Sequence, residues 1–141
     1  MQVFITEAAN QPGELARHTE AIASRGINLS SIVCVGMGDR GGAAFLAADE
    51  AGLRTALMDA GLAYREVPII PVAIEDRPGT AASAARALAD AGVNIEFLAP
   101  VDMRNGTVTL AIGVDNVESA RQALGDLVTD WSMGRTGAAA R

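Results

Sequence analysis

The chain has 141 residues, which is about the length of one average domain, and eleven basic against seventeen acidic residues give it a net charge of -6. Half of the residues are apolar but only 4% are aromatic. This composition predicts a folded core and argues against wholesale disorder. Nucleic-acid binding needs a basic face and aromatic stacking residues, so we expect no nucleic-acid partner.

Several classes of site are excluded by residue types that are rare or missing. All eleven basic residues are arginine, so no lysine is present for a Schiff base or a Walker-type phosphate loop. With one histidine, His18, and one cysteine, Cys34, we expect no disulfide, no metal site of His/Cys type and no cofactor. No apolar stretch approaches the roughly 20 residues of a membrane helix, and residues 1–7 lack a basic signal region. We therefore expect a cytoplasmic protein with no membrane association.

The chain contains an internal repeat. A Pro-Gly pair and a Gly-x-Asn triplet each occur twice, 66 residues apart: Pro12-Gly13 with Pro78-Gly79, and Gly26-Ile27-Asn28 with Gly92-Val93-Asn94. Further along, the offset becomes 67, which indicates one small insertion or deletion near the Gly-rich segment 36–42. Matches at a fixed offset indicate a duplicated structural unit. We predict domain 1 at residues 1–66, domain 2 at 67–133 and a flexible tail at 134–141.

Each half has the same predicted order of elements. In the first half, β-branched runs and turn residues predict strands at 3–6, 28–37, 43–48 and 62–67. One helix is predicted between Gly13 and Gly26, and Asp49 is the expected N-cap of a second. Residues 36–42 are interpreted as a flexible Gly-rich hairpin.

The second half repeats this pattern. Strands are predicted at 69–74, 95–103, 107–114 and 129–133, with helices at 78–91 and after Asp115, which forms a capping box with Glu118. Asn105-Gly106 is a strong hairpin signal. The pattern predicts an α+β fold of two tandem ferredoxin-like βαββαβ units, with antiparallel sheets and the helices on one face.

The loop before the first helix of each half is a candidate binding site. Free backbone N–H groups at a helix N-terminus attract a carboxylate, and Asn28 or Asn94 can supply both a donor and an acceptor. A loop and a strand start become neighbours when two units meet at an interface. Together they could hold a zwitterionic amino acid. The same residues are also ordinary helix and turn punctuation, so a purely structural role stays open.

Residues 72–79, the helix end at 88–92 and residues 93–96 resemble the ACT domain. The second half matches closely, and the first is a looser match with Asn10-Gln11-Pro12-Gly13 in place of the Asp-Arg-Pro-Gly form. The resemblance covers about residues 1–132 and extends to stand-alone tandem ACT proteins. ACT domains are regulatory modules that commonly bind amino acids at the interface between paired domains.

The resemblance implies ligand contacts in two loops and at two strand starts. Because the loops differ in charge, the two sites need not be equivalent. The implied loop positions are Asn10, Gln11, Gly13, Glu14, Leu15, Asp76, Arg77, Gly79, Thr80 and Ala81, and the strand positions are Asn28, Leu29, Asn94 and Ile95.

Two further residues have structural interpretations. His18 is expected to be a partly exposed surface residue of the first helix, because no acid or second histidine pairs with it in the sequence. Cys34 alternates with Ile32 and is expected to be a small core residue.

Three functions follow from these expectations. The first is a non-catalytic regulatory protein that binds a small ligand such as an amino acid between paired ACT domains, as a homodimer with a possible partner enzyme or regulator. The second is a ligand-independent interaction subunit of a metabolic enzyme or transcription factor. The third is a small enzyme, since ferredoxin-like folds also host catalysts. No nucleophile–base pair supports the third, so we expect no enzymatic activity.

Overall fold

The computed structural model describes residues 1–132, which form two compact units. The N-terminal unit is Gln2–Glu66, and the C-terminal unit begins at Val67 and also contains Met1. The predicted tail at 134–141 lies outside the described residues, as does residue 133.

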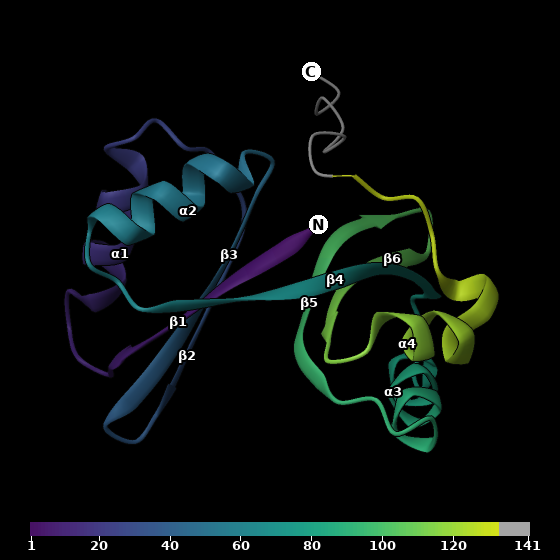
Figure 1. The fold of residues 1–141 in the computed structure, drawn as a ribbon. Helices are drawn as coiled ribbons and strands as arrows, with labels where there is room; N and C mark the ends of the chain where they lie inside the picture. The colour runs from purple at the N-terminus through teal and green to yellow at the C-terminus, as the bar shows by residue number, and fades with distance from the viewer. Residues whose placement is uncertain (133–141) are drawn as a thin grey trace. The chain divides into compact units, whose positions relative to one another are not determined.

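The N-terminal unit has the predicted order of elements. These are β1 (Gln2–Ala9), α1 (Glu14–Ala23), β2 (Leu29–Met37), β3 (Arg40–Ala47), α2 (Glu50–Asp59) and the first residues of β4 (Tyr64–Glu75). Strands β2, β3 and β1 lie side by side and are antiparallel. Helices α1 and α2 cover one face of these strands (Figure 1). The predicted α+β fold with a βαββαβ order is confirmed.

The C-terminal unit follows a similar plan. The rest of β4 is followed by α3 (Thr80–Asp90), β5 (Ile95–Arg104), β6 (Thr107–Val114), α4 (Val117–Leu124) and the short 3-10 helix η1 (Gly125–Leu127). Strands β4, β6 and β5 are antiparallel in that order. The turn of the β5–β6 hairpin is Asn105-Gly106, both with positive φ (51° and 74°), as the Asn-Gly signal predicted.

Three sequence predictions are wrong in detail. The strands expected at 62–67 and 69–74 form one continuous strand, β4, which contains both Pro68 and Pro71. The closing strand expected at 129–133 is reduced, within the described residues, to an isolated bridge between Val128 and Val72. The N-cap of α4 is Asn116 rather than Asp115, and the Asn116 side chain accepts a hydrogen bond from Ser119 N at 3.0 Å.

The two cores differ in chemistry. In the N-terminal unit, Phe4 and Phe45 are fully buried, and the Phe4 ring lies 5.7 Å from that of Tyr64. The Arg54 guanidinium lies over the Phe4 ring, with its Cζ 5.6 Å from the ring centroid. It also forms a bidentate ion pair with Glu66, in which Nε donates to Oε1 at 2.6 Å and Nη2 donates to Oε2 at 2.8 Å. The core of the C-terminal unit is aliphatic and includes Ile70, Val72, Leu88, Leu110 and Ile112. Within residues 1–132, no helix has the length and apolar character to cross a membrane.

Candidate ligand-binding site

A pocket opens in the N-terminal unit where the end of β1, the first turns of α1 and the β2–β3 hairpin meet. Its volume is about 80 Å³. Four residues of the predicted loop line it: Asn10, Gln11, Glu14 and Leu15. The other lining residues are Ala8, Ala9, His18, Cys34, Val35, Gly41, Gly42 and Ala43.

Small side chains on the helix-facing side of the sheet create this space. Ala8 lies opposite Gly41 in the β1–β3 ladder, and Thr6 lies opposite Ala43. At the corresponding positions of the C-terminal unit, the β4–β6 ladder pairs Ile74 with Val108 and Val72 with Leu110. These larger apolar side chains belong to, or pack against, the aliphatic core of that unit, whereas the N-terminal unit has small residues at these positions.

The loop before α1 is anchored to the β2–β3 hairpin through Asn10. Its side-chain Nδ2 donates to Gly38 O at 2.9 Å, and its backbone N donates to Asp39 O at 2.9 Å. A Cβ atom at Gly36 would lie only 2.6 Å from Asn10 Nδ2. The Gly-rich hairpin, interpreted from the sequence as merely flexible, therefore has a packing role, since Gly36 leaves room for the Asn10 side chain.

A negative charge stands at the mouth of the pocket. The Glu14 carboxylate accepts hydrogen bonds from Arg17 Nη2 at 2.9 Å and from Gln11 Nε2 at 3.3 Å. The bond from Arg17, and then that from Gln11, holds the pKa of Glu14 below its usual value. The N-cap of α1 is Gly13, at φ 92°, so no side chain caps the first-turn N–H groups. The Glu14 carboxylate, an acceptor, and the first-turn N–H groups of α1, which are donors, therefore lie close together.

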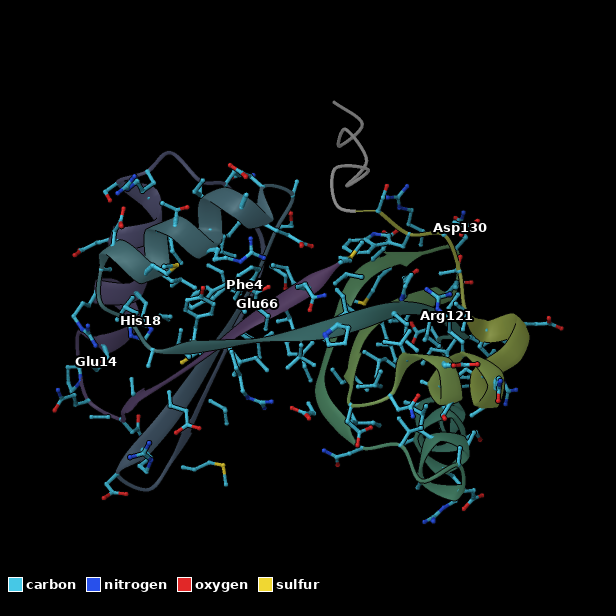
Figure 2. All side chains as sticks on the ribbon, viewed as in Figure 1. Phe4, Glu14, His18, Glu66, Arg121 and Asp130 are labelled. Carbon is cyan, nitrogen blue, oxygen red and sulfur yellow. The ribbon has the colours of Figure 1, made fainter. Side chains whose placement is uncertain are left out.

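The expected position of His18 is wrong, because the residue is only 2% exposed. Its Nδ1 lies 3.1 Å from Thr6 Oγ1, and its ring meets the Phe45 ring edge-on with centroids 6.3 Å apart. Figure 2 shows His18 and Glu14 on the same helix, α1. Burial lowers the pKa of His18, the charge of Arg17 lowers it further, and Glu14 opposes the shift. The imidazole is therefore neutral at pH 7.

This burial makes stability depend on pH. Because the pKa of His18 is lower in the folded state than its ordinary value of 6.5, the unfolded chain binds the proton more readily. The stabilising effect of the neutral ring is complete above that value and is lost as the pH falls below it. We expect the free energy of unfolding to decrease between about pH 7.5 and about pH 5.5.

The variant His18→Gln is the test of this dependence. Glu14 stays ionised throughout the interval, because its pKa is lowered from 4.5. Urea unfolding at both pH values should therefore show a smaller decrease for His18→Gln than for the wild type. An equal decrease in the two proteins would show that His18 is not responsible.

Cys34 also departs from expectation. It is exposed and lines the pocket rather than the core. It lies opposite Ala43 in the ladder with β3, in the same row as Thr6, but β2 has only β3 beside it among the strands of this unit. Because β2 is the outer strand of this unit, the Cys34 thiol is open to solvent.

A second pocket, of about 300 Å³, lies beside the corresponding loop of the C-terminal unit. Arg77 forms an ion pair with Glu75 there, and Thr80 Oγ1 donates to Glu75 O at 2.7 Å and to Arg77 O at 3.0 Å. The predicted residues that line it are Arg77, Gly79 and Thr80, together with Ile74, Glu75, Pro78, Ser83 and Leu127. Gly13, Asp76 and Ala81 are near these pockets in the chain but are not among the lining residues.

The predicted strand positions lie at the other end of each unit. Because β1 and β2 are both antiparallel to β3, the loop after β1 is near the end of β2, whereas Asn28 and Leu29 are at its beginning. About seven residues of strand, roughly 23 Å, separate the two ends. Asn94 and Ile95 are placed in the same way, and Asn94 N donates to Asp115 Oδ1 at 2.9 Å. Neither unit brings its own loop and strand start together.

No cluster of three His, Cys, Asp or Glu side chains that could hold a metal ion occurs within residues 1–132. The polar groups of the N-terminal pocket are instead a carboxylate, amides, a thiol and a neutral imidazole.

Comparison with known proteins yields structural matches only. No protein-family model matches the sequence, and no curated protein matches it either. A protein from Bacteroides thetaiotaomicron superimposes with a TM-score of 0.71 at 24% identity, over 87% of this chain and 85% of that chain. The regulatory subunit of aspartate kinase from Thermus thermophilus, in a ligand-free form, superimposes with a TM-score of 0.61 at 26% identity. The match covers 89% of this chain and 90% of that chain.

The regulatory subunit of aspartate kinase from Thermus flavus gives a TM-score of 0.58 at 25% identity, over 87% of this chain and 88% of that chain. The fold is that of ACT-domain regulatory proteins.

Proposed function

We propose that this protein is a regulatory module that binds a small amino acid at the N-terminal pocket. The carrying observation is a pocket that combines the uncapped N-terminus of α1 with the Glu14 carboxylate. The ligand carboxylate would accept hydrogen bonds from first-turn N–H groups, where the helix dipole also favours negative charge. The ligand ammonium would lie near Glu14. The similarity to aspartate kinase regulatory subunits supports a regulatory role.

In this proposal the predicted strand residues complete the site from a second domain. Asn28 and Leu29, or Asn94 and Ile95, would approach the loop of another unit, because they are too far from the loop of their own. Asn10, Gln11, Gly13, Glu14 and Leu15 would form the main site. The C-terminal loop residues Asp76, Arg77, Gly79, Thr80 and Ala81 would form a second, non-equivalent site. We propose a homodimer, and no catalytic role.

The experiment is a thermal-shift screen against the twenty amino acids, followed by calorimetry on the wild type and Glu14→Gln. A ligand at about 100 times its Kd stabilises a protein by roughly 2.7 kcal/mol, which is readily measured. We expect Glu14→Gln to weaken binding about tenfold or more, because it removes the charge while keeping the size. The control is Glu118→Gln, which alters the first turn of α4. No stabilisation by any amino acid at millimolar concentration would refute the proposal.

One observation favours the alternative, a ligand-independent interaction subunit. Val35 and Met37, two positions apart on the outer strand β2, are 54% and 74% exposed. Exposed apolar side chains that lie together are typical of protein interaction surfaces. That function predicts a stoichiometric complex with an enzyme or a transcription factor. Its affinity would be unchanged by amino acids and by Glu14→Gln, whereas ligand-dependent assembly would favour the regulatory ligand-binding role.

A further inference from the structure

A buried polar pair distinguishes the two units. Thr6 and His18 are 1% and 2% exposed, and they occupy the positions that Val72 and Ala84 occupy in the C-terminal unit, at 0% and 2%. The fold therefore accepts an apolar pair at these positions. Burying polar groups is costly unless their hydrogen bonds are satisfied, so the Thr6–His18 pair is not explained by packing alone.

The polar neighbours of the two ring nitrogens favour one tautomer of His18. We assign the proton of the neutral ring to Nδ1, because Arg17 Nη2, which can only donate, is the neighbour of Nε2 at 3.5 Å. Nδ1–H then donates to Thr6 Oγ1 at 3.1 Å, and the Thr6 hydroxyl donates to Ala43 O at 3.4 Å. Each group has one consistent role in this chain of bonds.

With this assignment, His18 Nε2 is an acceptor that is only weakly paired. Its contact with Arg17, at 3.5 Å, is longer than the range of about 2.7–3.2 Å for a normal hydrogen bond from N–H. The ring lines the pocket although it is almost fully buried. The neighbouring lining residues Ala8, Gly42 and Ala43 are small, so a ligand group can reach this region.

We infer that His18 Nε2 accepts a hydrogen bond from the ligand, and that the N-terminal pocket selects small amino acids with a hydroxyl on the side chain. This inference rests on the proposed function and adds a specificity-determining residue to it. The small volume, about 80 Å³, favours a ligand with a short side chain. An apolar side chain of equal size leaves the imidazole acceptor unpaired, and sites built around such an acceptor reject ligands that lack the donor.

The test compares two pairs of ligands of nearly equal shape by calorimetry: L-serine with L-alanine, and L-threonine with L-valine. The wild type should bind the hydroxyl member of at least one pair tenfold or more tightly. The double variant Thr6→Val/His18→Ala carries the apolar pair of the C-terminal unit, so it is expected to fold. Its preference should fall to within about threefold. Circular dichroism on each variant establishes that the fold is retained.

His18→Gln provides a conservative rescue. Its amide can donate to Thr6 and still offer an oxygen to the ligand, so a preference for the hydroxyl ligand should persist. Equal wild-type affinity within both ligand pairs, or an unchanged preference in the double variant, would overturn the role of His18 while leaving amino-acid binding intact. Failure of all four ligands to bind the wild type would overturn this inference, and failure of all twenty amino acids would refute the proposed function itself.

Discussion

Replacing Phe45 with alanine is expected to lower the free energy of unfolding of the N-terminal unit by about 3–5 kcal/mol. Phe45 is fully buried on β3, opposite Phe4 on one side and Ile32 on the other. It also contacts the edge of the His18 ring. Native domains are stable by only about 5–15 kcal/mol, and a unit as short as Gln2–Glu66 has a small core. Most of its stability should therefore be lost.

Urea unfolding followed by circular dichroism measures this loss. The matched control is Met58→Ala on α2, because Met58 is 63% exposed. Substitutions at such exposed positions usually change stability by less than about 0.5 kcal/mol. If Phe45→Ala cost no more than Met58→Ala, the aromatic core would not be the main source of stability in this unit.

Gly41→Ala is expected to destabilise the N-terminal unit by about 1–3 kcal/mol and to weaken ligand binding. A Cβ atom at Gly41 would lie 2.9 Å from the backbone oxygen of Val35 and 3.7 Å from the Cα of Gly36. A backbone oxygen within a strand ladder cannot rotate away as a side chain can, so the two strands of the hairpin must separate locally. Both Gly41 and Val35 line the pocket, and its shape changes with them.

The neighbouring glycine provides the control for this prediction. A Cβ atom at Gly42 would meet nothing closer than Thr6 O at 3.4 Å, an ordinary contact. Because side chains alternate along a strand, the Cβ of Gly42→Ala points to the opposite face of the sheet, so this variant tests the change from glycine to alanine itself at the same place in the hairpin. We expect its urea midpoint to stay near that of the wild type. Equal losses in the two variants would contradict the close contact with Val35 as the cause.

Local signals in the sequence predicted most of the fold. Gly13 and Gly79 have positive φ next to the first helix of each unit, and Asn105-Gly106 forms the expected hairpin. The continuity of β4 was not predictable in this way, because Pro68 and Pro71 are typical strand breakers. Within β4, Pro71 lies opposite Ala111, and its carbonyl oxygen accepts a hydrogen bond from Thr129 N at 3.0 Å. A contact with a segment so distant in sequence gives no local signal.

The candidate site was predicted only in part. The loop residues Asn10, Gln11, Glu14 and Leu15 were found from their position before a helix, but His18 was missed. Its burial depends on Thr6 and on strand β3, which the sequence alone does not place beside it. Comparison of the two repeats could have singled out His18. Thr6 and His18 both stand where the second half has an apolar residue, Val72 or Ala84.

The anchoring of Asn10 has a mechanical consequence. Two hydrogen bonds from Asn10 join the loop before α1 to the tip of the β2–β3 hairpin, and Gly36 leaves room for its side chain. We expect the two segments to move together. A ligand that displaces the loop also displaces Met37, whose side chain is 74% exposed at that tip. In the proposed function, this link would convert occupancy of the pocket into a change at an apolar surface, where another protein could detect it.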